Sequence, residues 1–121
     1  MISNNLNNLV KLLVTYNEIT ADGMMSLTDS SFFSNLEYLD MQENEICDIG
    51  AQIIATCSMK NLKFMNVRHN KIRDEGYKCI ADGENMPLLQ TLQIYPGNEA
   101  SMEAKKSLMR SRYLRCLSSV S

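Results

Sequence analysis

A pattern of apolar residues and one asparagine recurs three times along the chain, at intervals of 27 and 26 residues. The copies begin at Leu9, Leu36 and Leu62, and each follows the pattern apolar-x-x-apolar-x-apolar-x-x-Asn-x-Ile. The glycines that share one offset behind these copies are Gly23, Gly50 and Gly76. One such repeat cannot bury its apolar face alone, so we expect the repeats to stack side by side around a shared core.

Within each copy, apolar residues occupy every second position, which indicates a short, half-buried strand. The asparagines Asn17, Asn44 and Asn70 close these segments. An asparagine amide can donate to and accept from backbone groups that are left unpaired where a chain turns. We therefore interpret the three asparagines as structural residues.

Two aspartates, Asp48 and Asp74, stand two residues before the repeat glycine. An aspartate in such a place can accept hydrogen bonds from the first free amides of a helix, so we predict that both are N-caps. The first repeat has Ala21 at this offset. Its second segment is therefore expected to be a shorter or displaced turn.

The two ends of the chain differ from the repeats. A fourth copy begins at Leu89, but Gly97 stands at the asparagine offset, so we interpret this copy as degenerate. Residues 1–8 are expected to form an N-terminal cap with Leu6 as its apolar lid. Ser101–Leu117 has the pattern of one helix that would cap the other end, because terminal repeats would otherwise expose their stacking faces.

These residues resemble the leucine-rich-repeat pattern LxxLxLxxNxIxxxGxxxI over about residues 6–117, and the glycine-bearing segments are similar to the ribonuclease-inhibitor subclass. The resemblance implies an α/β fold, a short right-handed solenoid with a parallel concave sheet of about four strands and a helical convex side. We expect a single domain over residues 1–121. Its parts are an N-terminal cap (1–8), four repeats of which the last is degenerate (9–98), and a C-terminal capping helix with a tail (99–121).

Composition excludes several functions. A net charge of −2 provides no basic field for phosphate, so we expect no nucleic-acid partner. No apolar run is long enough for stable membrane insertion, and no secretory signal is evident at the first residues. The 4 cysteines lack metal-ligand spacing, which favours reduced thiols and a cytoplasmic location.

The sequence offers little support for an enzyme. It has no phosphate-binding or zinc-protease motif, and the single histidine, His69, lacks a neighbouring ligand set or catalytic pair. An enzyme that uses Cys47 or Cys116 would lack a nearby base. We therefore expect no catalytic residues, no metal and no cofactor.

The outward positions of the predicted strands carry aromatic and charged side chains. Tyr38 and Phe64 occupy equivalent places in adjacent repeats, with further aromatic residues near them. Aromatic residues among mixed charges are typical of the centre of a protein interface, although cross-strand aromatic pairs can also simply stabilise a sheet. The residues predicted to bind a partner are Tyr16, Tyr38, Asp40, Glu43, Phe64, Arg68, His69 and Tyr95.

The resemblance implies a non-enzymatic module that binds another protein through its concave face and is monomeric when free. If that partner is an enzyme, inhibition would be steric occlusion. The alternative is an adaptor that uses the basic C-terminal segment as a second site, through Lys105, Lys106, Arg110, Arg112 and Arg115. Small members of this subclass include enzyme inhibitors and effectors that intracellular bacteria deliver into host cells, and the short, Asn-rich chain is compatible with such delivery.

Overall fold

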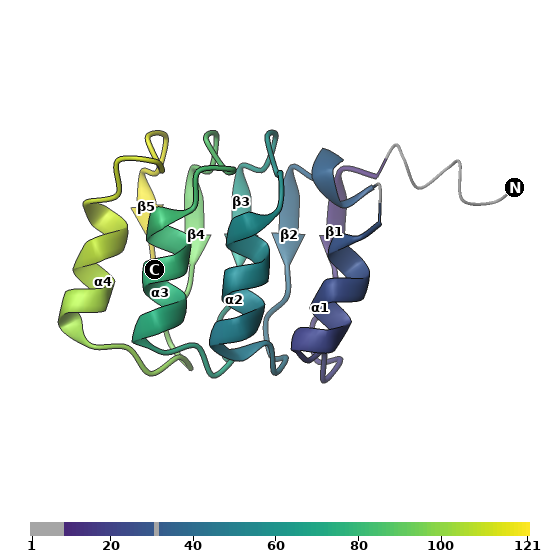
Figure 1. Cartoon of the computed structure of the whole chain (residues 1–121), viewed down its shortest axis with the longest axis horizontal. Coiled ribbons are helices and arrows are strands. Elements are labelled where there is room, and N and C mark those ends of the chain that lie inside the picture. The colour runs from purple at the N-terminus through teal and green to yellow at the C-terminus, as the bar shows by residue number, and fades with distance from the viewer. Residues whose placement is uncertain (1–8, 31) are drawn as a thin grey trace, which may run out of the picture.

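The computed structural model describes residues 9–30 and 32–121, in which strands and helices alternate. Five strands form one parallel sheet in chain order: β1 (Lys11–Leu13), β2 (Tyr38–Asp40), β3 (Phe64–Asn66), β4 (Thr91–Gln93) and β5 (Ser119–Val120). The elements that connect them are α1 (Ala21–Thr28), the 3-10 turn η2 (Phe33–Asn35), α2 (Cys47–Thr56), α3 (Asp74–Asp82) and α4 (Met102–Met109). The four α-helices form one layer across one face of the sheet (Figure 1), which confirms the expected α/β solenoid.

The strand register follows the sequence repeat. Leu39 of β2 lies beside Met65 of β3, which lies beside Leu92 of β4. All three side chains are fully buried under the helices. Since successive residues of a strand point to opposite faces, their neighbours Tyr38 and Phe64 lie on the other side of the sheet.

The repeat asparagines form the ladder that the sequence predicts. The side-chain oxygen of Asn44 accepts the backbone N–H groups of Asn17 and Ile19, each at 3.0 Å. Its amide donates to the carbonyl of Met41 at 2.9 Å. Asn70 donates to the same carbonyl at 2.9 Å. Asn44 and Asn70 each therefore bind backbone groups of their own repeat and of the preceding one, which is the structural role expected. The amide of Asn17 donates to the carbonyl of Thr15 in its own repeat at 2.9 Å.

The fourth repeat departs from the spacing of the others but keeps an asparagine in the same structural role, at Asn98 in place of the expected offset at Gly97. Asn98 accepts the backbone N–H groups of Asn70 and Ile72, each at 2.9 Å. Its amide donates to the carbonyl of Ile94 at 2.8 Å. One extra residue between Ile94 and Asn98 shifts the spacing, and Gly97 takes up the turn with a φ of +88°.

The C-terminal segment is not one helix over Ser101–Leu117. α4 ends at Met109, and the hydroxyl of Ser111 then donates to the carbonyl of Ala81 at the end of α3. The same oxygen accepts the backbone N–H of Leu114 at 3.2 Å. This turn brings the chain back to the sheet, where β5 adds a fifth strand to the four that were expected.

The predicted N-cap aspartates act across the repeat boundary. Asp48 Oδ1 accepts the backbone N–H of Arg73 at 2.7 Å and of Gly76 at 3.0 Å, at the start of α3. Asp74 accepts the backbone N–H of Ser101 at 2.6 Å, at the start of α4. Asp48 therefore caps α3, the helix of the following repeat. Asp74 binds Ser101, whose own hydroxyl caps α4 by accepting the backbone N–H of Ala104 at 3.2 Å. The assignment of each aspartate as the N-cap of its own helix is wrong.

The expected N-terminal cap, with Leu6 as its lid, lies outside the described residues. The first repeat forms the regular helix α1 of 8 residues, in place of the displaced turn expected from Ala21.

The core is one continuous layer between the sheet and the helices. Its fully buried side chains include Phe33, Leu39, Ile54, Met65, Ile80 and Leu92. Tyr77 of α3 is also fully buried, and its hydroxyl donates to the carbonyl of Ile94 at 3.4 Å. The helices thus cover one face of the sheet completely and leave the opposite face, called the open face below, without a covering element in the described part of the chain (Figure 1).

Candidate protein-binding surface

The centre of the open face is a pair of stacked rings. Tyr38 of β2 and Phe64 of β3 are register partners, and their ring centroids lie 4.1 Å apart with an interplanar angle of 7°. This spacing is close to the separation of neighbouring strands, so the sheet itself holds the rings face to face. Both side chains remain partly exposed. The structure therefore confirms that these two predicted site residues form a column.

A lysine extends the column on the β1 side. Lys11 is the register partner of Tyr38, and its ammonium nitrogen lies 4.4 Å from the centroid of the tyrosine ring. A cation over an aromatic face is attracted by the electron density of the ring. One face of Tyr38 is therefore covered by Lys11 and the other by Phe64.

A second column, two positions along each strand, is polar. Asp40 accepts the backbone N–H of Gln42 at 3.1 Å, and Asn66 accepts that of Arg68 at 3.1 Å. The amide of Asn66 donates to the side-chain oxygen of Gln42 at 2.9 Å, and the residue is only 3% exposed. These bonds fix the strand ends. They leave the carboxylate of Asp40, a predicted site residue, half-exposed beside the aromatic column.

Arg68 extends from the end of β3 toward the C-terminal edge of the sheet. Its Nη2 donates to the hydroxyl of Ser121 at 3.0 Å. The ion pairs found among the described residues join Lys63 to Glu37, Lys71 to Glu45 and Arg110 to Glu103, so none of them neutralises Arg68. Its Nε is buried and has no hydrogen-bond partner in the described part of the chain. The guanidinium is therefore a positive charge on this face that takes part in none of the ion pairs found among the described residues.

Three more predicted site residues, Tyr16, Glu43 and His69, share one position just beyond the strands. Their φ angles are 59°, 62° and 54°, so each repeat turns through the left-handed region at this point. Tyr16 is 71% exposed. His69 packs so closely against Gly97 that a Cβ added there would clash with its imidazole ring. These residues form a rim at one end of the strands, separate from the central stack.

Tyr95 does not join the open face. Its ring stacks on Tyr77 of α3, with the centroids 6.2 Å apart, and the ammonium of Lys105 in α4 lies 5.0 Å from its centroid. Burial raises the pKa of its hydroxyl above the ordinary value. The extra residue in this loop changes the alternation of side chains, which is why counting from Leu89 placed Tyr95 with the outward residues.

The sequence did not reveal the contribution of the C-terminal strand to this surface. Ser119 of β5 is the register partner of Thr91, and Ser121 lies next in the chain and binds Arg68. The sequence does contain a partial fifth copy of the repeat, because Leu117 and Val120 follow Leu89 and Leu92 by 28 residues. The prediction of a helix over this segment left no place for a strand there.

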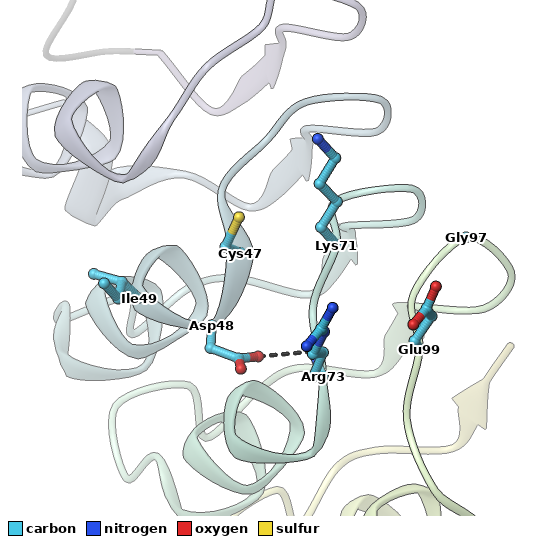
Figure 2. A pocket seen from close by; sticks show the side chains of 7 residues that line it. All are labelled: Cys47, Asp48, Ile49, Lys71, Arg73, Gly97 and Glu99. Atoms are coloured by element: carbon cyan, nitrogen blue, oxygen red, sulfur yellow. Dashed lines mark hydrogen bonds between the residues drawn. The ribbon is translucent and has the colours of Figure 1, made fainter.

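A hollow beside the starts of α2 and α3 lies away from the open face. This pocket of about 560 Å³ is lined by Cys47, Asp48, Ile49, Lys71, Arg73, Gly97 and Glu99. Figure 2 shows the Asp48 carboxylate directed at Arg73, whose backbone it binds, with Lys71 and Glu99 at the sides. The pocket is lined by charged side chains of both signs, and Asp48 already caps α3. These side chains therefore do not favour one chemical class of ligand over another.

Residues 9–30 and 32–121 contain no group of three or more His, Cys, Asp or Glu side chains placed to hold a metal ion. In the same residues, no helix is long and apolar enough to cross a membrane.

Comparison with protein families agrees with this geometry. A model of the Leucine Rich repeat family matches residues 5–27, 34–55 and 58–81, which together are more than half of the chain. The chain therefore belongs to the leucine-rich-repeat family. A search of curated proteins gave no match. Leucine-rich-repeat domains generally mediate protein–protein interaction and are typically non-enzymatic.

Proposed function

We propose that this chain is a non-enzymatic module that binds a partner protein through the open face of its sheet. The observation that carries the proposal is the partly exposed Tyr38–Phe64 stack at the centre of that face. Aromatic side chains with a polar surround are the usual anchors of protein interfaces. Here the surround consists of Asp40 and Glu43 on one side and Arg68 and His69 on the other.

The alternative role of the stack is simply to stabilise the sheet. Cross-strand aromatic pairs do contribute to sheet stability, so this role accompanies binding and does not exclude it. The stack is held in place by two register-matched strands before any partner arrives. A rigid surface loses little conformational entropy on binding, which favours its use as an anchor.

We propose further that, where the partner is an enzyme, the module inhibits it by steric occlusion. No chemical step is needed, because a preformed surface that covers an active-site cleft prevents substrate entry. Adding the module to the partner in equal amounts would abolish its activity. An adaptor would leave that activity intact and would bridge the partner to a third component.

The adaptor alternative depends on the basic C-terminal segment. Part of its charge is already engaged inside the molecule: Lys105 lies over the ring of Tyr95, and Arg110 lies 3.7 Å from Glu103. Lys106 and Arg115 are exposed. The open face is therefore the stronger candidate for the principal site.

Affinity capture followed by mass spectrometry identifies the partner. Titration calorimetry then compares the affinities of variants for that partner. The double variant Tyr38→Ala, Phe64→Ala is expected to weaken binding at least about tenfold, because truncating a central aromatic anchor costs about 2 kcal/mol or more. Its melting temperature should fall by only about a few degrees.

The matched control is Met25→Ala, Ile49→Ala, which removes two exposed apolar side chains from the helical side and should leave binding unchanged. A second comparison replaces Lys105, Lys106 and Arg110 with serine. If the basic-segment variant loses the partner and the aromatic variant keeps it, the open-face proposal is wrong and the adaptor takes its place.

A cytoplasmic location is a further proposal, supported by four free cysteines. Delivery into a host cell and a monomeric free state remain predictions. Fractionation of the producing cells and light scattering of the purified chain test them.

A further inference from the structure

The outward side chains in register with Tyr38 and Phe64 form the first column of the open face, and their length falls abruptly between β3 and β4. Its members in register are Lys11, Tyr38, Phe64, Thr91 and Ser119. The first three are long side chains that cover one another. Thr91 and Ser119 are short, so the column descends from a six-membered ring to two hydroxyl-bearing side chains. We call this place the step.

The wall of the step is one face of the Phe64 ring. Tyr38 covers the opposite face at 4.1 Å, nearly parallel. The face toward β4 borders Thr91, whose short side chain cannot cover a phenyl ring. No aromatic ring or cation of the described residues stacks there. The spacing between strands is that of stacked rings, so the space above Thr91 has the width of one further ring.

Arg68 supplies a positive charge beside the step. Gln93 and Ser121 occupy the neighbouring column on β4 and just beyond β5. Arg68 crosses to Ser121, and no carboxylate of the described residues neutralises it. A cationic group placed beside the step would be repelled, whereas an anionic group could pair with the guanidinium.

We propose that the step is a subsite for an aromatic side chain of the partner, flanked in the partner sequence by a carboxylate that pairs with Arg68. The aromatic ring continues the Tyr38–Phe64 stack over Thr91 and Ser119. The carboxylate supplies the negative charge that Arg68 lacks. This inference rests on the proposed function, since it describes how the open face would recognise its partner.

Ring stacking and charge distinguish this partner segment from other side chains that could occupy the step above Thr91. A leucine would fill part of the volume but would gain no ring-to-ring contact. An arginine could stack on Phe64, but its charge would stand close to Arg68. An acidic segment without a ring would pair with Arg68 and leave the face of Phe64 in water. The combination of a ring and a carboxylate uses both features.

Three capped synthetic peptides test the proposal, with the core Asp-Phe-Asp, Asp-Leu-Asp or Lys-Phe-Lys between glycines. Binding to the full chain is followed by the shifts of assigned amide signals in heteronuclear NMR spectra. We expect the Asp-Phe-Asp peptide to shift the amides of Phe64, Thr91 and Gln93. Its affinity should exceed that of the leucine peptide by about threefold to tenfold, the contribution of one aromatic pair.

Two variants locate the binding. Thr91→Phe should fill the step with the chain's own ring and abolish these shifts, while the matched variant Thr91→Val keeps the step open and keeps them. Arg68→Gln should reduce the affinity for Asp-Phe-Asp by about twofold to fivefold, in keeping with an exposed ion pair, and should reduce its preference over Lys-Phe-Lys. Thermal melts confirm that each variant is folded.

Equal affinities for the phenylalanine and leucine peptides would overturn the inference, as would unchanged binding to Thr91→Phe. The proposed function fails on a different result, namely that the natural partner ignores Tyr38→Ala, Phe64→Ala. A partner that requires Tyr38 and Phe64 but is unaffected by Thr91→Phe would leave the proposed function in place and exclude the step.

Discussion

The carboxylate of Asp48 accepts the backbone N–H of Arg73 at 2.7 Å, so a side chain at the start of α2 caps the first turn of α3. The same contact recurs one repeat later, where Asp74 binds Ser101 at the start of α4. Helix N-termini leave backbone N–H groups without intrahelical partners, and a carboxylate also matches the positive end of the helix dipole. The repeats are thus joined by electrostatic contacts on the helical side as well as by strand pairing.

We predict that Asp48→Ala lowers the free energy of unfolding by about 0.5–2 kcal/mol, the usual effect of removing a helix cap. The loss would arise at α3, because the N–H groups of Arg73 and Gly76 lose their acceptor. Urea denaturation measures it. Asp22→Ala, at an exposed position in the first turn of α1, is the control and should change stability much less. Equal effects of the two variants would contradict the cross-repeat cap.

Asn44→Ala should destabilise the chain by about 1–3 kcal/mol, because the buried amide satisfies backbone groups of two repeats. Asn17→Ala should cost less, since Asn17 is exposed and its amide donates to the nearby carbonyl of Thr15. Paired chemical denaturation curves measure the difference. An unfolding midpoint of Asn44→Ala equal to that of the unmodified chain would mean that the ladder contributes nothing.

The pH dependence of stability should depend in part on Asp74. Hydrogen bonds from the backbone N–H and hydroxyl of Ser101 lower the pKa of its carboxyl below the ordinary value of 3.8. A group whose folded pKa is the lower one stabilises the fold above its unfolded pKa, and this contribution is lost as the pH falls through the folded pKa. Melting temperatures should therefore decline at pH values below 3.8.

The Asp74→Asn variant isolates this effect. It should be less stable than the unmodified chain near neutral pH, and it should lose less stability on acidification, because position 74 no longer titrates. Asp82→Asn, at the other end of the same helix, is the matched control and should keep the acid dependence. If the pH profiles of Asp74→Asn and the unmodified chain are parallel, Asp74 does not act in this way.

The four cysteines should differ in their reactivity. Cys47 and Cys116 are exposed, whereas Cys57 and Cys79 are partly buried, and burial raises the pKa of both of these thiols. Because the thiolate is the reactive form, brief treatment with iodoacetamide near neutral pH should modify Cys47 and Cys116 at rates about tenfold higher. Peptide mass spectrometry reports each site. In urea all four should react alike, and a chain that already contains a disulfide would contradict the free-thiol assignment.

Periodicity was sufficient to predict the first four strands and the asparagine ladder. Leu39, Met65 and Leu92 had to lie on one face because each alternates with polar or aromatic neighbours, and the register places them side by side. The same alternation placed Tyr38 and Phe64 together on the opposite face. These features are local properties of a repeat, so the sequence of one repeat determines them.

Features that depend on neighbouring repeats were not predictable in the same way. The offset of Asp48 identifies a helix start but does not show which helix the carboxylate reaches. The extra residue before Asn98 moved the apparent asparagine position and reversed the orientation expected for Tyr95. The turn at Ser111 depends on a hydrogen bond to Ala81 in another helix, so no local signal separated α4 from the segment that forms β5.

The side-chain hydrogen bonds that join neighbouring repeats run in opposite directions along the chain. The side-chain oxygen of Asn44 accepts a hydrogen bond from the repeat before it, whereas the carboxylate of Asp48 accepts one from the repeat after it. A gene duplication that copies one whole repeat would therefore supply the donor and the acceptor of every hydrogen bond between the new repeat and its neighbours. A duplication of half a repeat would supply a donor without its acceptor, so arrays of this kind can change length readily only in units of a complete repeat.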